Sequence, residues 1–208
     1  MSSLRQIAAG HAPLLVMDAA SSRIQVGVWF TDGHQNWQAS DEEAGVGLFR
    51  CLDRLGLRLD EVAGFVFCEG PGSILGVRTV AVTLRTWNVL RPRPVFAYSS
   101  LALVAHALGR PDVTVIADAR RELWHRYRLG DSLRRVPTTD LAGALVMPEN
   151  FRHWSPLPEN VQRVPYSLAE LFPRAIDADI LFGTGEPDAF LHEEPGYVTW
   201  TPQIHRAP

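Results

Sequence analysis

The chain has 208 residues, of which 46% are hydrophobic and 21% are charged, and its formal net charge is −3. This composition is typical of a globular protein and excludes collagen-like, coiled-coil and largely disordered chains. A mildly acidic chain has no overall attraction for nucleic acid, so RNA binding would require a local basic patch or a partner. The apolar run at 13–17 is too short for a signal peptide core or a membrane span, so we expect a cytoplasmic protein with no membrane contact.

Three further features of the composition limit the chemistry. All 20 basic residues are arginine, which excludes a Schiff-base lysine, a lysine general base and a phosphate-loop lysine. The two cysteines, Cys51 and Cys68, are too few for a disulfide framework or a cysteine metal cluster. No two of the seven histidines are four residues apart, which excludes a helical metal-binding pair.

Hydrophobic periodicity predicts alternating strands and helices in the first half of the chain. Residues 62–68 form a continuous apolar run, which is typical of a strand in a sheet covered on both faces. Residues 42–57 begin with two glutamates and carry a leucine stripe, a pattern that favours a helix. We expect Ser99 or Ser100 to cap a later, shorter helix. The expected elements in chain order are strands at 14–20, 24–31 and 34–39, a helix at 42–57, a strand at 62–68, a helix at 75–90, a strand at 94–98 and a helix at 101–108.

The second half of the chain begins like the first. Residues 113–131 repeat the pattern of the first hairpin, with an apolar strand ending in Asp-Ala, a polar turn and an alternating second strand. Asp118 follows Asp18 by 100 residues. Internal duplication and chance similarity both explain the likeness. The chain from 137 onward is rich in proline, and we expect its aromatic residues to make it an ordered lobe rather than a tail: Trp154, Tyr166, Phe172, Tyr197 and Trp200.

The glycine-rich segment EGPGSILGVRT, at 69–79, lies between a predicted strand and a predicted helix, where backbone N–H groups can bind phosphate. A Walker loop has two glycines five residues apart followed by lysine, whereas Gly70 and Gly76 are six apart and are followed by Val77 and Arg78. The dinucleotide fingerprint Gly-x-Gly-x-x-Gly fails as well, because the last spacing is one residue longer here. The segment therefore predicts a vestigial phosphate loop or a simple turn.

The same segment does not form a nucleophile elbow. That motif is Gly-x-Ser-x-Gly, and Pro71 occupies the position of its first glycine, so Ser73 is a poor nucleophile. The simpler interpretation is that Gly70 and Gly72 adopt unusual dihedral angles, Pro71 stiffens the turn and Ser73 caps the following helix.

Two aspartates and three arginine pairs leave alternatives open. Asp18 and Asp118 could hold a magnesium ion or a phosphate-bound water at the mouths of two hairpins, or they could close the two turns, where aspartate is favoured. The arginine pairs, at 120–121, 126–128 and 134–135, could form a basic strip for RNA or a solvated face.

Four segments, in order, resemble the TsaB (YeaZ) family, bacterial relatives of the TsaD/Kae1 proteins. GPGSILGVR (70–78) is similar to the family signature Gly-Pro-Gly-Ser-Phe-Thr-Gly-Leu-Arg, and LLVMDAASSRIQVGVW (14–29) is similar to its opening strand and hairpin. SSLALVAHAL (99–108) resembles its Ser-Ser-Leu-Glu-Ala-Leu-Ala helix, and VIADARRELWHRYR (115–128) resembles its Asp-Ala-Arg-Arg-Gly-Glu-Val-Tyr strand. The likeness covers residues 14–130 well and the remainder loosely.

The resemblance implies an α/β, two-lobed fold of the actin/hexokinase/Hsp70 type with a ribonuclease-H-like sheet in each lobe, and we expect lobes at 1–109 and 110–208. It also implies a role, because TsaB is the non-catalytic partner of TsaD, which with TsaE attaches threonylcarbamoyl to the tRNA adenosine beside the anticodon. TsaD carries metal-binding histidines, and their absence here places this chain on the TsaB side.

We therefore expect a non-catalytic subunit without a cofactor, which meets tRNA only through a complex with a TsaD-like protein and a TsaE-like ATPase. The alternative is an ATP-binding or hydrolytic, glycoprotease-like enzyme of the same fold that no longer serves tRNA modification. In either case the chain could bind ATP and magnesium weakly. The sequence also departs from the family pattern, which makes it a divergent member. Ala19 replaces the threonine after the first aspartate, Ile74 and Leu75 replace Phe-Thr in the loop, and the His-Ser-Glu segment before the first helix is missing.

The predicted helix at 75–90 is apolar on two faces. One stripe, formed by Val77, Val80, Leu84 and Trp87, is expected to pack on its own sheet. The second stripe is left for the helix at 42–57 or for another chain. Because the helix at 42–57 also has apolar residues to spare, we expect a four-helix contact, which the resemblance implies for the TsaD heterodimer and for a homodimer of the chain alone. The expected contact residues are Val46, Phe49, Leu75, Thr79, Val82, Thr86 and Val89.

Overall fold

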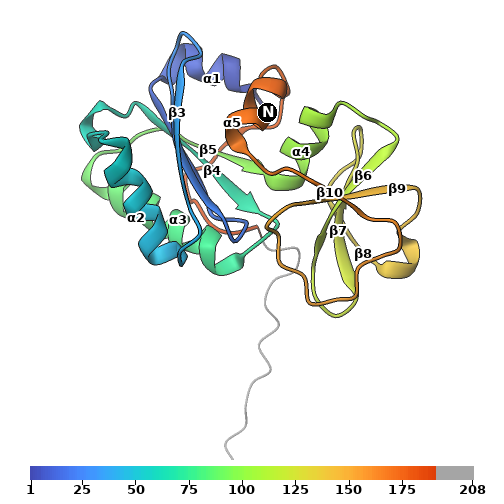
Figure 1. Ribbon diagram of the computed structural model, residues 1–208. Helices are drawn as coiled ribbons and strands as arrows, with labels where there is room; N and C mark the ends of the chain where they lie inside the picture. The colour runs from blue at the N-terminus through green and yellow to red at the C-terminus, as the bar shows by residue number, and fades with distance from the viewer. Residues whose placement is uncertain (191–208) are drawn as a thin grey trace, which may run out of the picture.

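The computed structural model describes residues 1–190, which two β-sheets organise (Figure 1). The first part of the chain contains α1 (Leu4–His11), β1 (Leu14–Asp18), β2 (Ile24–Trp29), β3 (Gln35–Ser40), α2 (Ala44–Leu55), η1 (Leu59–Glu61), β4 (Gly64–Gly70), α3 (Ile74–Leu90), β5 (Val95–Ser99) and α4 (Ser100–Leu108). It continues with β6 (Val113–Asp118), β7 (Leu123–Tyr127), β8 (Arg134–Pro137), η2 (Thr138–Asp140), β9 (Ala144–Pro148), β10 (Gln162–Val164), α5 (Leu168–Arg174) and β11 (Phe182–Gly183).

The strand order confirms the α/β fold with two sheets. The first sheet has the order β11-β5-β4-β1-β2-β3, and the second has the order β10-β9-β6-β7-β8. Both are mixed: β1 pairs antiparallel with β2 and parallel with β4, while β6 pairs antiparallel with β7 and parallel with β9. The hairpins β1–β2 and β6–β7, which each begin with an apolar strand, therefore occupy corresponding positions in the two sheets.

Helices cover both faces of the first sheet. In Figure 1, α2 and α3 lie on one side of it, and α1, α4 and α5 lie on the other. This explains why β1 and β2 are buried along their whole length and β4 along all but one residue, as the continuous apolar runs predicted. Phe172 of α5 anchors that helix by stacking on Trp37 and meeting Trp29 and Tyr98 edge-on.

The chain returns to the first sheet after the second is complete. β11 pairs antiparallel with β5, and the Gln25 side chain exchanges two hydrogen bonds of 2.9 Å with the backbone of Tyr166 and Leu168, at the start of α5. The second sheet itself is built entirely from residues between 113 and 164. The division at 109/110 stays a prediction, and in space the last described elements lie with the first sheet.

The elements predicted for the first half are confirmed to within a few residues, with helix 42–57 observed as Ala44–Leu55 and helix 75–90 as Ile74–Leu90. Ser99 occupies the N-cap position of α4, although its side chain makes no capping hydrogen bond. Tyr197 and Trp200, which we assigned to an ordered lobe, lie outside the described residues. Within residues 1–190, every helix is too short or too polar to cross a membrane.

Candidate functional site

The glycine-rich segment connects β4 to α3 as a turn packed against the first hairpin. Gly70 and Gly72 have positive φ values of 111° and 157°, as their position in a tight turn predicted. The Ser73 N–H donates a 2.7 Å hydrogen bond to the Ala20 carbonyl oxygen, and the Ser100 hydroxyl donates one of 2.7 Å to the Pro71 carbonyl oxygen. The turn is therefore held on two sides by the protein itself.

Close approach of backbone explains the glycines at 72 and 76. A Cβ atom on Gly72 would lie 2.3 Å from the Ala20 carbonyl oxygen, and one on Gly76 would lie 2.1 Å from the Ala19 carbonyl oxygen. Ser73 caps α3, as predicted, by accepting a 3.3 Å hydrogen bond from the Gly76 N–H. Two of the backbone N–H groups that could bind a phosphate, those of Ser73 and Gly76, thus already donate hydrogen bonds to the Ala20 carbonyl oxygen and the Ser73 hydroxyl.

Asp18 is fully buried beneath this turn, on the sheet face that α4 and α5 cover. Its Oδ2 accepts hydrogen bonds from the hydroxyls of Tyr98 (2.6 Å) and Tyr166 (2.7 Å), and its Oδ1 accepts one of 2.8 Å from the Ala20 N–H. Burial raises the pKa of Asp18, and the hydrogen bonds from the two tyrosines and from Ala20 offset only part of that effect. Burial likewise raises the pKa of the neighbouring Cys68 thiol well above its ordinary value.

These residues do not fit a magnesium ion with a nucleotide. Magnesium binds through carboxylates that remain accessible to water and to substrate phosphates, whereas both oxygens of Asp18 already accept hydrogen bonds within the core. Across residues 1–190, no cluster of three or more histidine, cysteine, aspartate or glutamate side chains could hold a metal ion. The arrangement stabilises the fold at the point where β1, β5 and the segment before α5 meet.

Asp118 performs a related structural role in the second sheet. Its carboxylate accepts hydrogen bonds from the backbone N–H groups of Arg120, Trp154 and Ser155 and from the Ser155 hydroxyl. Burial opposes ionisation of Asp118, but the backbone hydrogen bonds outweigh it and hold its pKa below the ordinary value. Asp118 therefore closes the β6–β7 turn and ties the 154–155 segment to it. The structure does not bring it together with Asp18, which lies in the other sheet.

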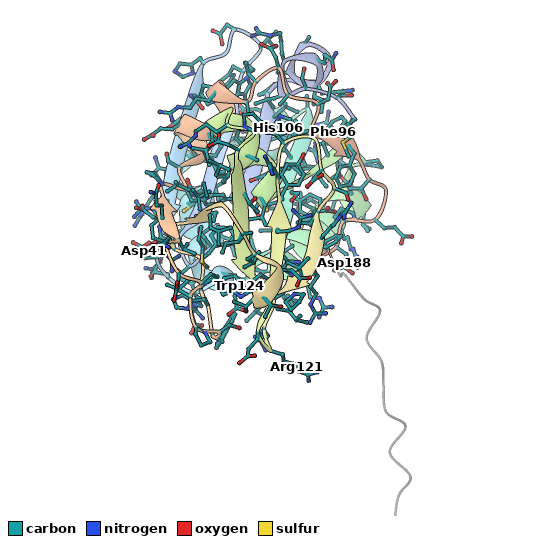
Figure 2. The ribbon with its side chains drawn as sticks, turned by 90° about the vertical axis from the view of Figure 1, so that its right-hand side faces the viewer. Asp41, Phe96, His106, Arg121, Trp124 and Asp188 are labelled. Atoms are coloured by element: carbon teal, nitrogen blue, oxygen red, sulfur yellow. The ribbon has the colours of Figure 1, made fainter. Side chains whose placement is uncertain are left out.

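Three charged residues in or near the loop have surroundings that the sequence did not reveal. Arg78 and Arg85 project from α3 toward Asp188, at N–O distances of 3.9 and 3.3 Å, and Figure 2 shows Asp188 at the edge of the described chain. Glu69, the residue before Gly70, is partly buried, and burial raises the pKa of its carboxyl from 4.5 to about 7.

An apolar surface covers the outer faces of α2 and α3, which lie side by side (Figure 1). Val77, Val80 and Leu84 face the core and are at most 1% exposed, as the first predicted stripe requires. The second stripe and its neighbours on α2 face outward, and we call them the α2–α3 face. Its large apolar members, with their exposed fractions, are Val46 (47%), Phe49 (46%), Leu75 (77%), Val82 (58%) and Val89 (84%).

The threonines of α3 make this face less polar than the sequence suggests. The hydroxyls of Thr79 and Thr86 donate hydrogen bonds of 2.9 Å to the carbonyl oxygens of Leu75 and Val82, one turn earlier. Each hydroxyl is therefore satisfied within the helix, so a partner would not have to supply a hydrogen bond for it.

Some residues of these sites could not be found from local pattern. Tyr98 and Tyr166 reach Asp18 from 80 and 148 residues away, and Asp188 lies 100 or more residues from its arginine partners. Ile74 and Leu90, at 49% and 78% exposed, extend the apolar surface at both ends of α3 and could have been predicted from the helical spacing.

Comparison with known proteins gives a family and a fold. The sequence model of the TsaD family, described as tRNA N6-adenosine threonylcarbamoyltransferase, matches residues 40–174, which is more than half of the chain. The sequence matches no curated protein.

Two solved structures have the same fold. YeaZ from Pseudomonas aeruginosa aligns with a TM-score of 0.53 and 23% identity over 65% of this chain and 75% of that one. A structure described as "an uncharacterized protein with similarity to peptidase YEAZ from Pseudomonas aeruginosa" aligns with a TM-score of 0.57 and 21% identity over 77% of this chain and 88% of that one. The family match over residues 40–174 shows that the chain belongs to the TsaD family, and its two mixed sheets give it a fold similar to that of YeaZ.

Proposed function

We propose that this chain is a non-catalytic partner subunit of a TsaD-like enzyme in the threonylcarbamoyl modification of the tRNA adenosine next to the anticodon. The α2–α3 face is the observation that carries the proposal. Five large apolar side chains on two adjacent helices are between 46% and 84% exposed, and a contiguous apolar surface of this kind marks an interaction site in a soluble protein.

The shape of the face suits a four-helix contact. Two parallel ridges of side chains from α2 and α3 can pack against an equivalent pair from another chain, as helices in bundles do. A stable interface of this type buries about 1,600 Å² in total, or about 800 Å² on each partner. The same face would form a homodimer when the chain is alone and would be released to bind the TsaD-like partner.

An ATP-binding or hydrolytic enzyme is the competing function, and the surroundings of Asp18 argue against it. The carboxylate is buried and bonded to two tyrosines, and the glycine turn is closed by Ala19 and Ala20. In this proposal the chain binds no nucleotide of its own, works in the cytoplasm, and reaches the TsaE-like ATPase and the tRNA within the complex.

Affinity purification from the source cells tests the proposal. We expect the tagged chain to recover a TsaD-like protein, and Val82→Arg to abolish that recovery, because it places a charge at the centre of an apolar contact. Leu157→Arg is the matched control, since Leu157 is a similarly exposed apolar residue (42%) that lies outside the α2–α3 face. Recovery of the TsaD-like protein by Val82→Arg at the wild-type level would contradict the proposal.

Ultracentrifugation of the isolated chain tests the homodimer. The wild-type chain and Leu157→Arg should sediment as dimers at micromolar concentrations, whereas Val82→Arg should be a folded monomer. A monomeric wild-type chain would show that the face does not bind a second copy.

A further inference from the structure

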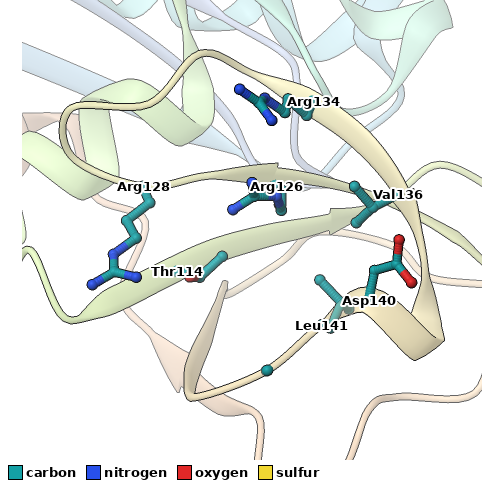
Figure 3. Close-up of a pocket in the computed structure, with 8 residues that line it drawn as sticks. Thr114, Arg126, Arg128, Arg134, Val136, Asp140 and Leu141 are labelled. Atoms are coloured by element: carbon teal, nitrogen blue, oxygen red, sulfur yellow. The ribbon is translucent and has the colours of Figure 1, made fainter.

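The outer face of the second sheet contains a cavity of about 360 Å³ lined by three arginines, which we call the arginine pocket (Figure 3). Its volume lies within the range of small-molecule sites. The lining residues are Thr114, Arg126, Arg128, Arg134, Val136, Asp140, Leu141 and Ala142.

Strand alternation explains why these arginines share one face. Arg126 of β7 lies directly opposite Arg134 of β8 in the antiparallel register, so their side chains share a face. Arg128, the residue after the end of β7, lines the same cavity. Arg135 pairs with His125 and points to the opposite side. The basic strip considered from the sequence is therefore divided between two faces, and three of its members line one cavity.

This arrangement brings like charges together. Like charges directly opposite each other on neighbouring strands destabilise a sheet. One carboxylate outside the pocket relieves part of the repulsion, since Asp131 lies 3.4 Å from Arg126. Arg134 is exposed and has no ion-pair partner within residues 1–190. Counting the lining residues alone, three arginines face one carboxylate, that of Asp140.

We propose that the arginine pocket binds phosphate groups of the RNA backbone, and so adds a contact to the tRNA that the proposed TsaD-like partner recruits. The proposal rests on the proposed function for the identity of the RNA. A guanidinium group can donate two parallel, charge-assisted hydrogen bonds to two oxygens of one phosphate. Three guanidinium groups in one cavity suit a polynucleotide, which presents several phosphates, better than a single small anion.

Salt-dependent binding of fluorescently labelled tRNA to the isolated full chain tests this contact. Each phosphate contact contributes about 0.7 to 0.9 to the slope of log affinity against log salt. Three contacts predict an affinity about 20- to 40-fold weaker at about 200 mM salt than at about 50 mM. Arg134→Gln should remove one contact, so that the loss of affinity between the two salt concentrations falls to about 7- to 12-fold. Asp140→Asn should tighten tRNA binding, because it removes a negative charge that repels the phosphates.

Arg174→Gln is the matched control, because Arg174 ends α5 as an exposed arginine outside the pocket and its loss changes the net charge equally. The proposal is overturned if tRNA fails to bind at low salt, or if Arg134→Gln and Arg174→Gln reduce the salt slope equally. Calorimetry with inorganic pyrophosphate separates a small-anion site from an RNA site, and pyrophosphate binding without tRNA binding would refute the RNA assignment. None of these measurements requires the TsaD-like partner, so their failure is distinct from failure to recover that protein.

Discussion

Glu69→Gln tests whether the residue that opens the glycine turn costs the protein stability. Burial raises the pKa of Glu69 from 4.5 to about 7, which means that the folded protein binds a proton on Glu69 more tightly than the unfolded chain does. The stabilising effect of that proton is fully present below pH 4.5 and is lost as the pH rises through about 7. Glutamine has the shape of protonated glutamate and cannot ionise, so the variant should lack this loss.

The size of the effect follows from the pKa. A rise from 4.5 to about 7 corresponds to about 3 kcal/mol, at 1.36 kcal/mol for each tenfold change in proton affinity. The carboxylate is only partly buried, and screening by water reduces this figure, so we expect about 1.5 kcal/mol. At pH 8 the variant should exceed the wild-type free energy of unfolding by about this amount, while at pH 4.5 the two should agree to about 0.5 kcal/mol.

Urea unfolding at pH 4.5, 6 and 8 measures the difference directly, because titrations common to both proteins cancel in the comparison. Glu149→Gln is the control, since Glu149 is an exposed glutamate outside the turn and its replacement removes the same charge. If Glu69→Gln is no more stable than the wild type at pH 8, or if its gain is the same at all three pH values, the burial argument is wrong.

Two further substitutions test the contacts beneath the turn. Gly76→Ala should destabilise the protein by about 3 kcal/mol in chemical unfolding, because its Cβ would lie 2.1 Å from a carbonyl oxygen. Gly45→Ala, in the exposed first turn of α2 with nothing within 4 Å, should instead be neutral or stabilising by up to about 1 kcal/mol. Tyr166→Phe removes one of the two hydroxyls that bind the Asp18 carboxylate and should lower the unfolding free energy by about 2 kcal/mol. An unchanged unfolding midpoint for either Gly76→Ala or Tyr166→Phe would contradict the corresponding contact.

The fold of the first half could be predicted from the sequence because its elements are long and strongly periodic. The helix α3 has 17 residues, and its pattern separated the buried Val80 from the exposed Val82 without any tertiary information. The strands β10 and β11 have only three and two residues, too few for periodicity to register, and they form because partners are available in the two sheets. The helix α1 could have been found, since Ser3 and Gln6 form a capping box at its start.

The candidate site was less predictable. The spacing of the glycines was enough to argue against a working phosphate loop, and the close approach of Gly76 to Ala19 supplies the physical reason. The residues that surround Asp18 come from distant parts of the chain, and nothing in the local sequence marks Tyr98 or Tyr166 as partners of Asp18. The arginine pocket required the strand register, because the sequence alone did not show that Arg126 and Arg134 are opposite each other while Arg135 points away.

The return of the chain to its first sheet has a consequence for how the two halves hold together. The polypeptide crosses between the sheets once after α4 and again after β10. After the second crossing, the Tyr166 hydroxyl donates a hydrogen bond to Asp18, and the backbone of Tyr166 and Leu168 exchanges hydrogen bonds with the Gln25 side chain. A single cut in the loop at 109–112 would therefore leave two fragments that remain associated, because β11 still supplies an edge strand to the first sheet. The second sheet is therefore connected to the first sheet by two covalent crossings of the chain, and cutting one of them does not release it.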